Sequence, residues 1–184
     1  MANLLTLARM LAIIPFSIFF LIDQPWNMNA ALLVFVSAGI TDFFDGWVAR
    51  ARNEVSALGA AIDPIADKLL IAAGLILLVE NRVIQGASII AVLIIIIREI
   101  LVSGLREAVG NKGAKIPVTF LAKIKTTVQI LAIAALLLAA PNGFFGNALI
   151  PLAIGLLWTA AVLTLWTGAA YIKKSIEILQ PSPE

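Results

Sequence analysis

Cysteine and histidine are both absent from this chain of 184 residues. Without cysteine there is no disulfide, no thiolate metal site and no cysteine nucleophile. Without histidine the commonest general base and transition-metal ligand is missing. Any chemistry must therefore use carboxylates, lysine, arginine or hydroxyl groups, and a bound metal is expected to be a hard ion with oxygen ligands.

Charge is scarce as well. Charged residues make up 13% of the chain and hydrophobic residues 61%, with a mean hydropathy of +1.03. A soluble domain is about 25% charged and about 45–50% apolar. So few charges could not keep this much apolar surface dispersed in water. The composition predicts an integral membrane protein, and no nucleic-acid partner is expected.

Six stretches are long and apolar enough to cross a bilayer as helices, which takes about 20 residues each. The sequence therefore predicts an all-α membrane protein with six transmembrane helices. Asn3, Thr6 and Arg9 recur at every third position, which predicts an interfacial helical segment at the N-terminus. No repeat or long linker divides the chain, so one membrane domain over 1–184 is expected. The approximate spans are 4–22, 30–49, 56–79, 87–105, 118–140 and 148–172.

The basic residues indicate the orientation in the membrane, because Lys and Arg accumulate on the cytoplasmic side. Only Arg82 falls on the other side, in the turn after the third span. Both termini are therefore expected in the cytoplasm, which an even number of spans allows. The ten residues on the cytoplasmic side are Arg9, Arg50, Arg52, Arg106, Lys112, Lys115, Lys123, Lys125, Lys173 and Lys174.

Four aspartates lie where the second span ends and the third begins. Asp42 and Asp45 are three residues apart, and Asp63 and Asp67 are four apart, so each pair shares one helix face. A short connection makes the two spans antiparallel neighbours, which lets the pairs face each other. Four desolvated carboxylates would repel one another unless cations lay between them. Two divalent ions, Mg²⁺ or Mn²⁺, would balance the charges and could serve phosphoryl transfer.

A plainer interpretation makes these aspartates helix caps or ion-pair partners of neighbouring bases. Four carboxylates on facing surfaces favour the metal site over that interpretation. Small residues beside them could serve close helix packing or clear space for a ligand, and spacing alone does not separate the two. The bases are Arg50, Arg52 and Lys68, and the small residues are Gly46, Ala49 and Gly59.

The pattern Asp42-x2-Asp45-Gly46-x2-Ala49-Arg50-x8-Gly59-x3-Asp63-x3-Asp67 resembles the complete signature of the CDP-alcohol phosphotransferases. The opening Asn3–Arg9 is similar to the usual start of that family. The segments 98–107 and 123–127 resemble those of its bacterial phosphatidylglycerophosphate synthases. The resemblance covers nearly the whole chain.

That resemblance implies a six-span fold, usually homodimeric, in a bacterial inner membrane. Its polar cavity would open to the cytoplasm. The four aspartates would hold two divalent cations, and Asp67 would also be the general base. Gly46 and Arg50 would lie against the CDP moiety, with Ala49 and Gly59 giving room. The implied substrates are CDP-diacylglycerol and glycerol 3-phosphate, and the products are phosphatidylglycerol phosphate and CMP.

A phosphorylated acceptor needs a cationic pocket of its own. Arg98 and Arg106 are eight residues apart and lie on nearly one face of the fourth span. Lys123 and Lys125 lie early in the fifth span, across the connecting loop. Together these four side chains could hold a phosphate through charge-assisted hydrogen bonds, whereas Glu99 could neutralise Arg98 or Lys125.

Three other activities fit parts of the pattern. The aspartate signature does not distinguish acceptors such as serine or inositol phosphate, although the 98–107 and 123–127 segments favour glycerol 3-phosphate. Membrane prenyltransferases also bind diphosphates through metal-held aspartates, but their motifs lie on separated segments of longer chains. A cation channel or transporter would need acidic residues at several depths or broken helices, whereas here the charges gather toward one side.

Overall fold

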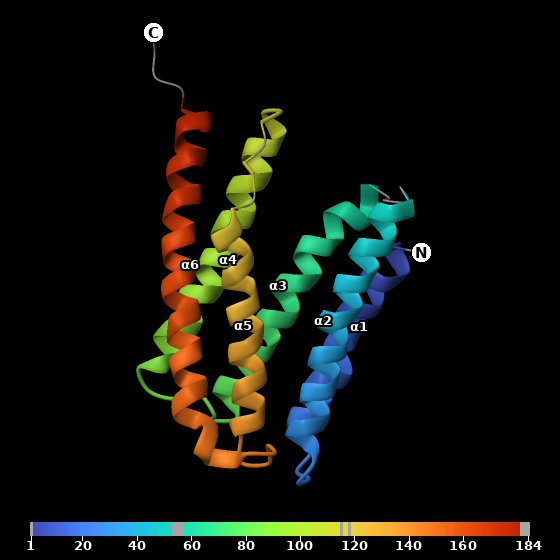
Figure 1. Cartoon of the computed structure of the whole chain (residues 1–184), viewed down its shortest axis with the longest axis vertical. Coiled ribbons are helices and arrows are strands. Elements are labelled where there is room, and N and C mark those ends of the chain that lie inside the picture. The colour runs from blue at the N-terminus through green and yellow to red at the C-terminus, as the bar shows by residue number, and fades with distance from the viewer. Residues whose placement is uncertain (1, 53–56, 115, 118, 181–184) are drawn as a thin grey trace. The chain divides into compact units, whose positions relative to one another are not determined.

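The structure is a computed structural model that describes residues 2–52, 57–114, 116–117 and 119–180, with side chains described for 9–41, 65–114, 116–117 and 119–180. The described residues form helices and connecting turns, without a strand (Figure 1). The helices are α1 (Ala2–Leu21), α2 (Asn27–Arg52), α3 (Ala57–Glu80), α4 (Ser88–Asn111), α5 (Phe120–Ala139), the short 3₁₀ helix η1 (Gly146–Leu149) and α6 (Ile150–Leu179).

Each predicted span coincides with one of these α-helices, so the all-α prediction is confirmed. The largest differences are at the C-terminal ends of α4 and α6, which continue to Asn111 and Leu179. The added residues include Arg106 and Lys173, whose straight side chains favour helix and allow the helix to extend beyond the apolar stretch. Within the described residues, α4, α5 and 146–179 are long and apolar enough to span a membrane. The count of six spans remains a prediction.

Large apolar side chains cover the outer surfaces of these helices. Leu33 on α2 is 72% exposed, Ile100 on α4 is 67% exposed and Trp166 on α6 is 71% exposed. Water-soluble proteins rarely expose contiguous apolar surface on this scale. Together with the hydropathy of α4, α5 and α6, this surface identifies a membrane protein.

The chain divides into two compact units, Met1–Gln85 with Ile133–Ala153, and Gly86–Ala132 with Ile154–Glu184. The single domain over 1–184 therefore stays a prediction. In the first unit α1 packs against both α2 and α3. The ring of Phe16 lies 5.2 Å from that of Phe20 and 5.9 Å from that of Phe35. A Cβ at Gly74 would come within 3.3 Å of Ile133 Cγ2, so a glycine there lets α3 approach that residue closely.

The C-terminus of α3 ends in a Schellman motif, a hydrogen-bonded turn whose central residue is left-handed. The amide of Val83 donates to Leu78 O at 3.0 Å, and the amide of Arg82 donates to Val79 O at 3.0 Å. Arg82 takes the left-handed position with a φ of 56°, where glycine is usual. The motif turns the chain sharply at the end of α3.

Candidate active site

The predicted aspartates are carried by the C-terminal part of α2 and the N-terminal part of α3. Asp42 and Asp45 belong to α2, and Asp63 and Asp67 belong to α3, within the first unit. Of the residues predicted to bind metal or CDP-lipid, Asp67 is the one with a described side chain. The side chains of Asp42, Asp45, Gly46, Ala49, Arg50, Gly59 and Asp63 lie outside the described part.

Arg9 of α1 is bound to Asp67. Its Nη1 donates to Asp67 Oδ1 at 2.7 Å, in an ion pair where the Arg9 side chain is 5% exposed and that of Asp67 is 49% exposed. The first helix thus brings a buried guanidinium to the carboxylate predicted to be the base. The sequence interpretation used Arg9 as a topology signal and missed this contact. A single charge inside an apolar first span was the available signal, because such charges are usually functional.

The donor set fits a hard divalent cation. The four residues supply carboxylate oxygens, which suit Mg²⁺ and Mn²⁺, and the chain has no cysteine or histidine to favour a softer metal. About half of the Asp67 side chain is exposed while its Oδ1 is bound to Arg9. Among the side chains that the structure describes, no cluster of three or more metal-binding groups occurs. Three of the four aspartates lie outside that set.

A buried polar cluster occupies the second unit, and Arg98 of α4 is its first member. Arg98 is 7% exposed, and its Nη2 donates to Thr167 Oγ1 of α6 at 2.8 Å. Its Nη1 lies 3.4 Å from Glu99 Oε1, while its Nε has no hydrogen-bond partner among the described residues. That Nε faces Gly168 of α6, where a Cβ would come within 3.1 Å of it.

Glu99 joins three helices through the same cluster. Its Oε1 accepts hydrogen bonds from Lys125 Nζ and from Gln129 Nε2 of α5, the latter at 3.2 Å. Gln129 also donates to Thr164 Oγ1 of α6 at 3.0 Å. The expectation that Glu99 neutralises neighbouring bases is confirmed, because it pairs with both Lys125 and Arg98.

The remaining predicted acceptor-pocket residues are exposed. Arg106 is exposed, and its Cζ lies 6.0 Å from the centroid of the Tyr171 ring. The Cζ of Arg98 lies 5.9 Å from the same centroid. Lys123 is exposed whereas Lys125 is buried. Two residues correspond to a rotation of about 200° on a helix, so the two lysines point in different directions. The structure thus brings Arg98, Arg106 and Lys125 into one cluster and leaves Lys123 on the surface of α5.

Sequence reasoning did not single out the α5 and α6 members of this cluster. Gln129, Thr164 and Thr167 are each at most 3% exposed, and Tyr171 is 5% exposed. Polar side chains inside an apolar helix are usually satisfied by neighbouring helices, and that was the available signal. Which helix supplies the partner depends on tertiary packing, which hydropathy does not reveal.

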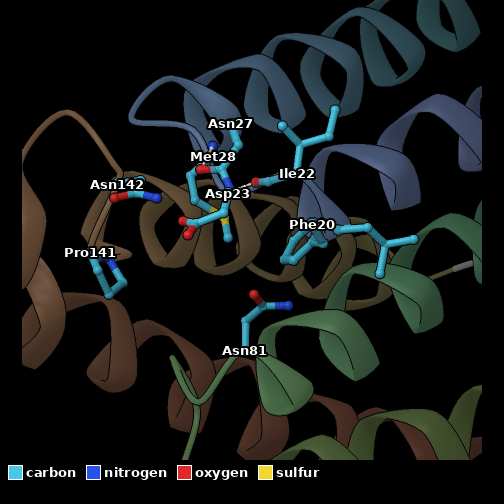
Figure 2. A pocket seen from close by; sticks show the side chains of 9 residues that line it. Phe20, Ile22, Asp23, Asn27, Met28, Asn81, Pro141 and Asn142 are labelled. Carbon is cyan, nitrogen blue, oxygen red and sulfur yellow. Dashed lines mark hydrogen bonds between the residues drawn. The ribbon is translucent and has the colours of Figure 1, made fainter.

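A cavity of about 250 Å³ lies elsewhere in the first unit. Figure 2 shows the polar side chains of Asp23, Asn27, Asn81 and Asn142 around it, together with the apolar side chains of Phe20 and Met28. Asn81 follows Asp67 by fourteen residues, a distance of about 21 Å along a helix. The cavity is therefore at the opposite end of α2 and α3 from the aspartates and is separate from the candidate active site.

Comparison with known proteins decides the family. A family model described as CDP-alcohol phosphatidyltransferase matches residues 1–166. The chain belongs to this family. The match includes α1 to α5 and the first half of α6, so it covers the aspartate segment and all four predicted acceptor-pocket residues.

Three similar proteins carry the same name. A Rickettsia bellii protein named CDP-diacylglycerol–glycerol-3-phosphate 3-phosphatidyltransferase is 42% identical over 174 residues, covering 93% of this chain and 92% of the relative. An Escherichia coli protein of that name is 39% identical over 177 residues, covering 92% and 91%. A Cereibacter sphaeroides protein of that name is 35% identical over 212 residues, covering 97% and 96%. The chain is thus a transferase of this family.

Proposed function

We propose that this chain transfers the phosphatidyl group of CDP-diacylglycerol to glycerol 3-phosphate and releases CMP. The observation that supports this most directly is the shared name of relatives that are 35–42% identical and align over more than nine-tenths of this chain. The complete aspartate signature on α2 and α3 supplies the donor side of the reaction. The basic residues of α4 and α5 supply the side that binds a phosphorylated acceptor.

In the proposed reaction, the sn-1 hydroxyl oxygen of glycerol 3-phosphate attacks the lipid-linked phosphorus of CDP-diacylglycerol. A new phosphorus–oxygen bond forms, the bond to CMP breaks, and the hydroxyl proton passes to Asp67. An alcohol is a poor nucleophile until a base takes its proton. With no histidine or cysteine in the chain, a carboxylate is the suitable base, and that of Asp67 is half-exposed.

Asp42, Asp45, Asp63 and Asp67 are proposed to hold two divalent cations, Mg²⁺ or Mn²⁺. Such ions neutralise a pyrophosphate and stabilise the departing CMP. Gly46 and Arg50 are proposed to contact the CDP moiety. Their small neighbours Ala49 and Gly59 would leave room for it between α2 and α3.

Arg98, Arg106, Lys123 and Lys125 are proposed to bind the acceptor phosphate. Arg98 and Lys125 support this proposal together, because both pair with the single carboxylate of Glu99 and leave one net positive charge to attract an anion. The exposed side chains of Arg106 and Lys123 could attract the incoming anion from the surface.

The proposed setting is a bacterial inner membrane, with both termini and the aspartates on the cytoplasmic side. The basic residues after α4 and in α6 support that orientation. A homodimer is proposed from the family resemblance. Membrane lipids would contact the exposed apolar faces of the helices.

Purified protein in mixed micelles should convert labelled glycerol 3-phosphate and CDP-diacylglycerol to labelled phosphatidylglycerol phosphate, with one CMP released per turnover. Activity should require Mg²⁺ or Mn²⁺ and disappear when a chelator removes the metal. Parallel assays with serine and inositol phosphate test other acceptors. Transfer to either of these, with none to glycerol 3-phosphate, would overturn the proposed acceptor while leaving the family chemistry intact.

A further inference from the structure

One aromatic ring lies beneath two arginines of α4. The Cζ of Arg98 is 5.9 Å and that of Arg106 is 6.0 Å from the centroid of the Tyr171 ring. The two arginines start about 12 Å apart along the α4 axis, because eight residues separate them. Their side chains must therefore converge to meet one ring. Tyr171 lies on α6 and is 5% exposed, so the ring is packed within the bundle.

The ring attracts both guanidinium groups without using their hydrogen-bond donors. A cation near an aromatic face is held by the ring quadrupole, and each guanidinium still has five N–H donors. Of the Arg98 nitrogens, Nη2 binds Thr167 and Nη1 lies near Glu99, whereas Nε has no partner among the described residues. Arg106 is exposed and can therefore offer its planar, bidentate donor set to an anion, while the buried Arg98 adds a second positive charge beside the same ring.

A hydrogen bond and a glycine support this arrangement of the ring and the arginines. The Tyr171 hydroxyl donates to Pro117 O at 3.2 Å, which attaches the ring to the loop between α4 and α5. Gly168 lies one turn earlier on α6, and a Cβ there would come within 2.9 Å of Arg98 Cγ and 3.1 Å of Arg98 Nε. A glycine is therefore needed for Arg98 to lie along α6 and reach the ring.

We infer that Tyr171 is a positioning residue that holds Arg98 and Arg106 together as the binding site for the acceptor's phosphate dianion. The inference rests on the proposed function, because it deepens the acceptor pocket described there. Like charges on Arg98 and Arg106 repel, and the ring offsets that repulsion before the anion arrives. The arrangement favours a phosphorylated alcohol over a neutral one, because a dianion is attracted by both guanidinium groups even with Glu99 beside Arg98.

The test removes the aromatic ring of Tyr171 but leaves a large apolar side chain in its place. Tyr171→Leu should raise the KM for glycerol 3-phosphate about five- to thirtyfold, as expected from two lost cation–π contacts. The KM for CDP-diacylglycerol and the kcat at saturating acceptor should stay within about twofold. Inorganic phosphate, used as a competing anion, should inhibit this variant correspondingly less. Tyr171→Phe, which keeps the ring, should restore most of the acceptor affinity.

Trp166→Leu is the matched control, because it removes another α6 aromatic whose side chain is 71% exposed on the outer surface. An unchanged acceptor KM in Tyr171→Leu would overturn the inference, as would an equal loss in Tyr171→Phe. If Tyr171→Leu does not fold, the variant Gly168→Ala tests the same inference. Its added Cβ should push Arg98 off the ring and raise the acceptor KM alone, and a normal KM would overturn the inference. If wild-type protein does not use glycerol 3-phosphate, the proposed function fails separately.

Discussion

At the scale of single residues, Asp67 combines a place in the signature with a half-exposed side chain. Asp67→Asn keeps the shape of the side chain but removes its charge and most of its basicity. Turnover should fall by about 10²–10⁴-fold, the usual cost of losing a general base. Steady-state kinetics at saturating substrates and metal would measure it. CDP-diacylglycerol binding should survive better than in Asp42→Asn or Asp63→Asn, and near-normal turnover would exclude Asp67 as the base.

The structure adds Arg9 to this site, because its guanidinium forms an ion pair with Asp67. Arg9→Met removes the guanidinium 2.7 Å from Asp67 Oδ1 while retaining an apolar, unbranched side chain. Arg9 orients the Asp67 carboxylate, and misplacing a catalytic group can cost about a hundredfold, so kcat should fall by up to about 10²-fold. The Mg²⁺ concentration for half-maximal activity should also fall, because a positive charge beside a metal ligand is gone.

Metal titrations of activity in wild type, Arg9→Met and Arg9→Lys would separate these effects. Arg9→Lys retains the charge and should leave the metal requirement close to that of wild type. A metal requirement that rises in Arg9→Met would show that Arg9 assists metal binding, contrary to this expectation.

At the scale of elements, the end of α3 contains a strained residue. Arg82 adopts a φ of 56°, which costs roughly 1–2 kcal/mol for a residue with a Cβ. Arg82→Gly should therefore raise the free energy of unfolding by about 0.5–1 kcal/mol, after the greater chain entropy of glycine is deducted. Thermal unfolding in detergent would show a higher midpoint. Arg82→Val should lower it, and equal midpoints in the two variants would contradict the Schellman assignment.

Glu99 is the carboxylate that connects α4 with α5 and, through Gln129, with α6. Glu99→Gln keeps the shape but removes the negative charge next to Lys125 and Arg98. Weakening a buried charged network of this kind should lower stability by about 1–3 kcal/mol. The same detergent unfolding assay applies. Glu107→Gln, on an exposed part of α4, is the matched control and should unfold at the wild-type midpoint.

At the scale of the whole molecule, charge distribution predicts how the chain lies in the membrane. Reporter fusions after Lys174 should give a cytoplasmic signal, and fusions within 81–84 should give an extracytoplasmic one. The ten-to-one bias of basic residues is the reason. An extracytoplasmic signal from the C-terminal fusion would reverse the orientation of the aspartates and of the proposed substrates.

The sequence alone determined the helical membrane character and the family, because both depend on local information. Apolar runs of about 20 residues form helices in lipid wherever they lie, since backbone groups must bond internally. The Asp42–Asp67 signature likewise depends only on spacing along α2 and α3. The expectation that Glu99 neutralises neighbouring bases also followed from local charge.

The tertiary structure decided which distant groups meet. Arg9 and Asp67 are 58 residues apart, and Arg98 and Thr167 are 69 apart. Hydropathy fixes the length of a helix but not which of its faces meets which neighbour. Lys123 and Lys125 looked equivalent in sequence, yet one is exposed and the other is buried on Glu99. The convergence of Arg98 and Arg106 on Tyr171 depends on the packing of α6 against α4, because that packing brings the ring within 6.0 Å of both Cζ atoms.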